Sequence, residues 1–93
     1  MAGEHKAVQV RVTGRVQGVG FRDWTAREAR QLGLKGWVRN ENDGSVAALI
    51  VGTEEVVDAM IERLRKGPGS AAVAGVNAEP AEIAELPVDF RRL

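Results

Sequence analysis

The sequence predicts an α+β fold of the ferredoxin-like, or split βαβ, type, in which one antiparallel sheet carries two helices on one face. Segments of alternating apolar and polar residues, typical of half-buried strands, flank two segments whose apolar residues recur at helical spacing. A strong hairpin signal, Asn42-Asp43-Gly44, separates two of the expected strands. The 93 residues suffice for one hydrophobic core but not for two. The predicted order is β-α-β-β-α-β.

The first half of this order runs to the end of the hairpin. The alternation in Ala7–Thr13 predicts a strand with its valines on one face. Helical spacing predicts a helix over Phe21–Leu32, and Gly33 is placed to end it in a left-handed conformation. The two strands of the hairpin are expected at Lys35–Glu41 and Ser45–Val51.

The second half contains one clear helix and two weaker strands. Thr53 is expected to cap the helix with its hydroxyl, and two glutamates follow it in the first turn. Gly67 and Pro68 are expected to end this helix. Ala72–Glu79 is weakly strand-like, and Val88–Arg91 alternates as a short final strand would.

Composition excludes several classes of function. Thirteen basic and thirteen acidic residues sum to zero, whereas a protein that wraps duplex nucleic acid carries a basic surplus, so we expect no nucleic-acid partner. The absence of cysteine excludes disulfide scaffolds, zinc ribbons and thiol catalysis. The single histidine, His5, makes a metal cluster implausible, and we expect no cofactor.

Chain organisation is simple. Residues 1–5 are expected to form a short N-terminal tail and residues 6–93 the single domain. No apolar run reaches the ~18 residues of a membrane span, and the N-terminus lacks the apolar stretch of a signal peptide. We therefore expect a cytoplasmic protein without a membrane partner, and a monomer by default.

The glycine-rich segment Arg15–Gly20 is the first candidate site. A glycine-rich turn between a strand and a helix can aim several backbone N–H groups at one anion, and the helix N-terminus adds partial positive charge. The segment is neither a Walker A loop nor a G-x-G-x-x-G motif, because Asp23 stands at the last glycine position. A purely structural turn is an equally good interpretation of this segment alone.

Two polar residues add to the loop. Arg22 follows it in the first helical turn, where a planar guanidinium could take two phosphoryl oxygens. A helix N-terminus carries partial positive charge, so an arginine there is unfavourable unless an anion lies nearby. This anion could be either a ligand or the adjacent Asp23. Asn40, at the end of a predicted strand, either orients a substrate or water or simply starts the turn. Alternation places Val38 and Asn40 on one face of that strand and Glu41 on the other.

Together these segments resemble a known family. Gly14-Arg15-Val16-Gln17-Gly18-Val19-Gly20-Phe21-Arg22 resembles the first signature of acylphosphatases, and Gly36-Trp37-Val38-Arg39-Asn40, followed by Asp43-Gly44-Ser45-Val46, resembles the second. Gly67-Pro68 and Phe90 also fit the family pattern. The resemblance extends from about Lys6 to Leu93.

The resemblance implies a metal-independent hydrolase of acyl phosphates, whose product, inorganic phosphate, competes with the substrate. It implies that Arg22 and the amides of the loop bind the phosphoryl group and that Asn40 positions the attacking water. The substrate-binding residues carried over are Arg15, Val16, Gln17, Gly18, Val19, Gly20 and Phe21.

Two non-catalytic alternatives remain. Ferredoxin-like modules that bind RNA present aromatic residues on their central strands, and the predicted first and third strands of this chain present none. Acylphosphatase-like domains also form the leading part of larger carbamoyl-transfer proteins. A free-standing enzyme remains the favoured interpretation.

Overall fold

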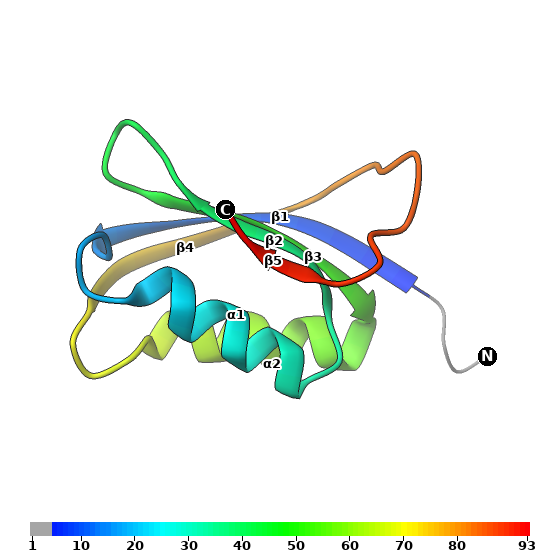
Figure 1. The fold of residues 1–93 in the computed structure, drawn as a ribbon, viewed down its shortest axis with the longest axis horizontal. Helices are drawn as coiled ribbons and strands as arrows, with labels where there is room; N and C mark the ends of the chain where they lie inside the picture. The colour runs from blue at the N-terminus through cyan, green and yellow to red at the C-terminus, as the bar shows by residue number, and fades with distance from the viewer. Residues whose placement is uncertain (1–4) are drawn as a thin grey trace.

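The computed structural model describes residues 5–93, which form a five-stranded sheet with both helices on one face (Figure 1). The strand order across the sheet is β4-β1-β3-β2-β5, so that β3 is central, β1 and β2 flank it, and β4 and β5 form the edges. The elements are β1 (His5–Arg15), α1 (Phe21–Gln31), β2 (Lys35–Asn40), β3 (Val46–Thr53), α2 (Glu54–Lys66), β4 (Ala72–Pro80) and β5 (Phe90–Arg92).

The ferredoxin-like order is confirmed, but the expectation of a purely antiparallel sheet is wrong. Neighbours among β1 to β4 are antiparallel, whereas β5 runs parallel to β2, with Phe90 opposite Gly36. The connection after β4 carries the chain to the far edge of the sheet, where Gly36 donates its N–H to the carbonyl of Asp89 (2.9 Å). Alternation in a short segment predicts which side chains share a face but not the direction of pairing.

The first strand is longer at both ends than its alternating pattern. His5, expected in the tail, is the first residue of β1 and lies opposite Thr53; residues 1–4 of the expected tail lie outside the described residues. At the other end, Gly14 and Arg15 continue the pairing with β4 after a shift of register at Thr13. Pairing with strands on both sides therefore extends β1 beyond the segment that the alternation marks.

The helix ends follow the sequence signals with one exception. Gly20 and Gly33 flank α1 with positive φ values of 78° and 73°, which glycine adopts without strain. Thr53 does precede α2 as its N-cap residue, but its hydroxyl makes no capping hydrogen bond, so the expected hydroxyl cap is wrong. An ion pair between Arg63 and Glu28 (2.9 Å) joins the two helices.

The core lies between the sheet and the helices. The valines of β1 share one face of the strand, as the alternation predicts, and are buried on the side of the sheet that α2 covers. Fully burying one such side chain stabilises the fold by about 1.5–3 kcal/mol. The larger fully buried side chains of this core are Val10, Val12, Val16, Phe21, Val38, Val46, Ile50, Val57, Met60 and Leu64.

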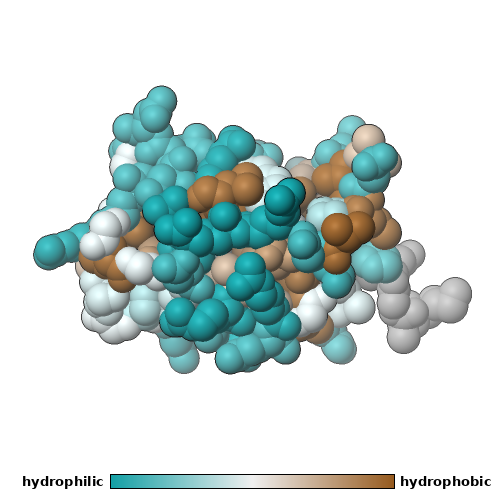
Figure 2. Space-filling model, in the orientation of Figure 1, coloured by the Kyte–Doolittle hydropathy of each residue, from teal (hydrophilic) through white to brown (hydrophobic). Residues whose placement is uncertain are grey.

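The surface is largely hydrophilic in the view of Figure 2, where hydrophobic residues gather at the end from which the β4–β5 connection projects. This connection carries the exposed side chains of Leu86 and Val88. Within residues 5–93, no helix combines the length and apolar character that a membrane crossing requires.

One buried polar atom is left without a partner. The Thr25 side chain in α1 is fully buried, and its hydroxyl oxygen makes no hydrogen bond. Replacing Thr25 with valine, which has nearly the same shape, should raise the free energy of unfolding by about 1 kcal/mol, because a hydroxyl without a partner no longer loses its hydration. The melting temperature should rise by roughly 4–8 °C. Thr25→Ser, which keeps the hydroxyl and loses the methyl group, should melt below the wild type; a valine variant that melts no higher than the wild type would contradict the argument.

Candidate active site

Three segments meet at one end of the molecule: the loop between β1 and α1, the end of β2 at the β2–β3 hairpin, and the end of β5 (Figure 1). They enclose a cavity of about 120 Å³. Its lining residues are Val16, Gly18, Gly20, Phe21, Arg22, Asp23, Asn40 and Arg92.

The β1–α1 loop, which forms part of the cavity wall, carries backbone N–H groups that have no partner among residues 5–93. Gly18 and Gly20 have φ values of 76° and 78°, a conformation that lets consecutive N–H groups turn toward one side. No hydrogen bond within the described residues uses the N–H groups from Gln17 to Asp23; the first helical bond is donated by Trp24. The first N–H groups of any helix lack an acceptor within the helix, which accounts for those at the start of α1 but not for those of the preceding loop. The loop therefore leaves a set of donors available to an anion.

Arg22 is positioned by the end of the chain. It lies in the first turn of α1, and its Nη1 donates to the main-chain oxygen of Leu93 (2.8 Å). Leu93 in turn donates its N–H to the carbonyl of Val38 in β2 (2.8 Å). The contact places the guanidinium beside the end of β2. Asp23, the alternative partner in the sequence, instead pairs with Arg92 (2.6 Å).

Asn40 ends β2 and reaches the cavity from the helix-covered face of the sheet, the face on which Val38 is buried. The opposite face of the strand carries Arg39, which stacks over Trp37 (4.6 Å) and pairs with Glu41 (2.6 Å). The predicted alternation is confirmed, and Glu41 points away from the cavity. No hydrogen bond within the described residues engages the side-chain amide of Asn40, which leaves it available to a ligand or a water.

Gln17 fastens the loop to the hairpin. Its Nε2 donates to the main-chain oxygens of Glu41 and Ser45, each at 2.8 Å. Because Glu41 directly follows Asn40, these bonds join the loop with the unpaired backbone N–H groups to the strand that carries the Asn40 side chain. A glutamine in a glycine-rich loop thus has a structural partner across the site.

Six of the nine residues that the sequence singled out line the cavity, and three do not. Arg15 is exposed at the end of β1, where it pairs with Ala72 of β4. Gln17 turns its side chain to the hairpin. Val19 packs against the core and accepts a hydrogen bond from Ser70 through its carbonyl (2.9 Å).

Arg92 and Asp23 also line the cavity, and neither was predicted from the sequence to do so. Alternation from the buried Phe90 would have put Arg92 on the helix-covered face. Its position beside the cavity depends on the parallel pairing that sets Arg92 opposite Val38, and no local pattern predicts this pairing.

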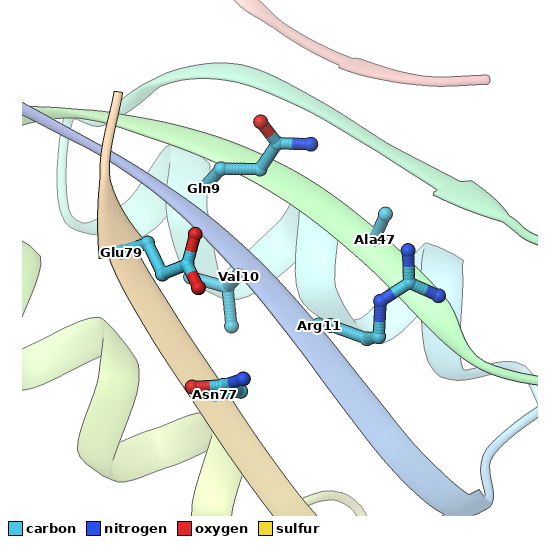
Figure 3. A pocket seen from close by; sticks show the side chains of 6 residues that line it. All are labelled: Gln9, Val10, Arg11, Ala47, Asn77 and Glu79. Carbon is cyan, nitrogen blue, oxygen red and sulfur yellow. The ribbon is translucent and has the colours of Figure 1, made fainter.

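A larger hollow, of about 200 Å³, lies on the open face of the sheet (Figure 3). It forms where the small Ala47 of β3 leaves space beside long polar side chains of β1 and β4. Arg11 there is already bound to Asp43 (3.1 Å) and to Ser45 (2.8 Å). It contains neither the unpaired amides nor the arginine of the first cavity, so we place the candidate site in the smaller one. The lining residues are Gln9, Val10, Arg11, Ala47, Asn77 and Glu79.

Comparison with known proteins identifies the family. Residues 8–91 match the model of the Acylphosphatase family. The acylphosphatase of Rhizobium etli is 58% identical over 91 residues, which cover 98% of this chain and 97% of that protein. The chain belongs to the acylphosphatase family. Its activity is that of an acylphosphatase, since the identity extends over nearly the whole of both proteins.

Solved structures agree with this family. The structure of an acylphosphatase from Coxiella burnetii superposes with a TM-score of 0.90 at 36% identity, covering 96% of this chain and 93% of that one. Full-length HypF contains a similar domain, with a TM-score of 0.86 at 25% identity; the match covers 100% of this chain and 12% of HypF. The same fold therefore occurs both as a small protein and as part of a large one.

The turn beside the site contains a strongly bound carboxylate. Asp43 Oδ1 accepts hydrogen bonds from the Ser45 hydroxyl (2.6 Å) and from its N–H (2.9 Å), and Oδ2 faces Arg11. The Ser45 hydroxyl, its N–H and the charge of Arg11 hold the pKa of Asp43 below the usual value of 3.8. The bound carboxylate therefore stabilises the fold above its unfolded pKa, and this stabilisation is lost as the pH falls through the folded pKa.

We expect Asp43→Asn to be less stable than the wild type at pH 7 and the two proteins to converge as the pH falls below about 4. Urea unfolding measured between pH 7 and pH 2 checks this. Asp89→Asn, which removes a carboxylate that makes no side-chain hydrogen bond or ion pair within the described residues, is the control for the lost charge. A difference between Asp43→Asn and wild type that stays constant down to pH 2 would show that the carboxylate is not bound as described.

Proposed function

We propose that this acylphosphatase splits the carboxyl–phosphate bond of acyl phosphates within the 120 Å³ cavity, releasing a carboxylate and inorganic phosphate. The observation that carries the proposal is the convergence of unpaired backbone N–H groups, the Arg22 guanidinium and the free Asn40 amide on one small cavity. This set of groups offers donors for an anion and a positioning group for a water.

The phosphoryl group is bound by the loop and Arg22. The segment Arg15–Phe21 supplies the turn, and the N–H groups from Gln17 onward supply donors at the positive end of α1. The bond from Nη1 of Arg22 to Leu93 orients the guanidinium plane and leaves Nε and Nη2 for phosphoryl oxygens. A planar fork held in advance costs less side-chain entropy on binding than a free one.

Asn40 acts on the attacking water. Its carboxamide oxygen can accept a hydrogen bond from the water while its NH2 group donates one to another oxygen, so that the water is oriented toward phosphorus. Gln17 keeps this amide at a constant distance from the loop, because it joins the loop to the residue that follows Asn40. Positioning of this kind depends on the two segments moving together.

The reaction needs little activation by the protein. An acyl phosphate has a good leaving group, and phosphoryl transfer passes through a loose transition state in which positioning and charge stabilisation contribute most of the acceleration. Among the described residues that line the cavity, Asp23 is the one carboxylate, and it is bound to Arg92. We therefore propose that the substrate itself or bulk water takes the proton.

We extend the proposal to the setting of the enzyme. Residues 6–93, together with His5 of β1, act as a single catalytic domain and as a monomer. The absence of cysteine fits a reducing compartment, and we propose the cytoplasm. The reaction as proposed uses no metal, because amides and arginine supply the positive charge.

A non-catalytic binding module is less well supported. The open face of the sheet lacks an aromatic platform on its central strands: the outward side chains there include Gln9 and Arg11 of β1 and Ala47 of β3. Trp37 of β2 is covered by Arg39 and is not free to stack on a base. The hollow of Figure 3 would be the site of such a module, and a control below tests it.

Arg22→Lys should lower kcat/KM for benzoyl phosphate by roughly thirty- to 150-fold, because lysine keeps the charge but loses the planar fork, at a cost of about 2–3 kcal/mol. The assay is steady-state hydrolysis in excess chelator. Arg27→Lys, an exposed arginine of the same helix, should retain wild-type activity. A folded Arg22→Lys enzyme with nearly full activity would rule out Arg22 as the phosphoryl ligand, and activity lost in chelator and restored by a divalent ion would rule out the metal-free reaction.

Asn40→Ala should lower kcat by roughly a hundredfold or more while inorganic phosphate still inhibits competitively with an unchanged constant, because the amide acts on the water and not on the anion. Substrate and phosphate titrations on the same preparation measure both quantities. Asn77→Ala, in the hollow on the open face, is the matched control and should leave both unchanged. Weakened phosphate inhibition in Asn40→Ala would assign Asn40 to the anion instead.

A further inference from the structure

We infer that Arg92 is a specificity-determining residue that favours acyl phosphates whose acyl group carries a second negative charge, as in the monophosphate of a dicarboxylic acid. The inference rests on the proposed function, since it assumes that the phosphoryl group occupies the loop and Arg22. It assigns the acyl end of the substrate to a part of the cavity wall that binding of the phosphoryl group leaves unused.

The position of Arg92 follows from the edge of the sheet. β5 pairs in parallel with β2, so that Arg92 lies opposite Val38. Asn40 follows Val38 by two residues in β2 and lies on the same face of the sheet. Its side chain reaches α1, where Nε lies 2.6 Å from Oδ1 of Asp23. Arg92 and Asn40 therefore line one cavity from neighbouring strands, while Arg22 lines it from the helix.

The charges of the wall decide what the acyl group meets. The cavity is lined by two guanidinium groups and one carboxylate, those of Arg22, Arg92 and Asp23. If the loop amides and Arg22 hold the phosphoryl oxygens, the charged groups that remain are Asp23 and Arg92. Asp23 is already bound to Nε of Arg92, so an anionic acyl group would meet the terminal nitrogens of this guanidinium, whereas a neutral group would gain less from them.

Arg92 has donors to spare for such a group. The contact with Asp23 is made through Nε, and within residues 5–93 neither terminal nitrogen of Arg92 takes part in a hydrogen bond. Its side chain is 44% exposed, so a ligand can approach it from the solvent side. Asp23 thus holds the side chain over the cavity and leaves its outer edge free for two parallel hydrogen bonds to a carboxylate.

The adjacent Arg91 offers a matched contrast. It lies opposite Trp37 on the open face of the sheet and does not line the cavity. Removing either arginine changes the net charge of the protein equally. An effect specific to Arg92 therefore reports its position beside the site, and an effect common to both reports the overall charge of the protein.

The experiment compares three rigid substrates that cannot cyclise: benzoyl phosphate, carboxybenzoyl phosphate and the isosteric, neutral carbamoylbenzoyl phosphate, the last two as 3- and 4-substituted isomers. The quantity measured is the ratio of kcat/KM for the carboxy substrate to that for the carbamoyl substrate. Intrinsic reactivity cancels when this ratio is compared between the wild type, Arg92→Gln, Arg92→Lys and Arg91→Gln.

For at least one isomer, we expect the ratio to be about three- to tenfold higher in the wild type than in Arg92→Gln, mainly through KM, and to shrink at high salt because the contact is partly exposed. Arg91→Gln should match the wild type, and Arg92→Lys should keep part of the preference. Arg91→Gln should hydrolyse benzoyl phosphate within about twofold of the wild-type rate.

Each other outcome overturns a definite statement. Equal ratios in wild type and Arg92→Gln for both isomers refute the specificity role, and a parallel fall for all substrates in Arg92→Gln assigns Arg92 to holding Asp23 and the loop instead. Equal effects of Arg92→Gln and Arg91→Gln refute a local contact. Failure of the wild type to hydrolyse benzoyl and carbamoylbenzoyl phosphates would refute the proposed function itself, which the Arg92 comparison leaves untouched.

Discussion

The structure around the site depends on one constraint: the backbone N–H groups from Gln17 to Asp23 must stay near the surface without an internal acceptor. Because these donors form no hydrogen bond within the described part of the protein, they do not help to hold the loop in place, and the loop needs support from elsewhere. The buried Val16 anchors one end in the core and Phe21 anchors the other. Gln17 supplies the remaining tie, by hydrogen bonds to the hairpin. The donors are thus held in place by groups that do not compete for them.

The charged side chains around the cavity are likewise held by partners of their own. Arg22 is oriented by a main-chain oxygen of Leu93, a contact made through Nη1 alone. Asp23, the neighbouring carboxylate that could have cancelled its positive charge, is drawn away by Arg92. On the other face of β2, Glu41 is bound by Arg39. Both carboxylate side chains next to the anion site therefore have an arginine partner other than Arg22.

Much of the site could be predicted because its groups are close in sequence. The loop, the helix start and Arg22 form one continuous segment, and the glycines mark where the backbone must turn. Asn40 could be placed on the correct face by alternation alone. Arg92 escaped prediction because it reaches the cavity through a three-residue strand at the edge of the sheet, for which the sequence carries no pairing signal. The missing cap at Thr53 shows the same limit, since a suitable residue type does not ensure the hydrogen bond.

The sequence by itself determined the order of the elements, the faces of the strands, the stops at Gly33 and Gly67 and the family, because each depends on residue types within one turn or one strand. The tertiary structure alone decided that the sheet is mixed, that Arg22 donates a hydrogen bond to Leu93 and that Asp23 forms an ion pair with Arg92. These three features share one cause. They arise where residues about 50 to 70 positions apart meet at the edge of the sheet, and the partner in such a meeting is chosen by the packing of the whole domain.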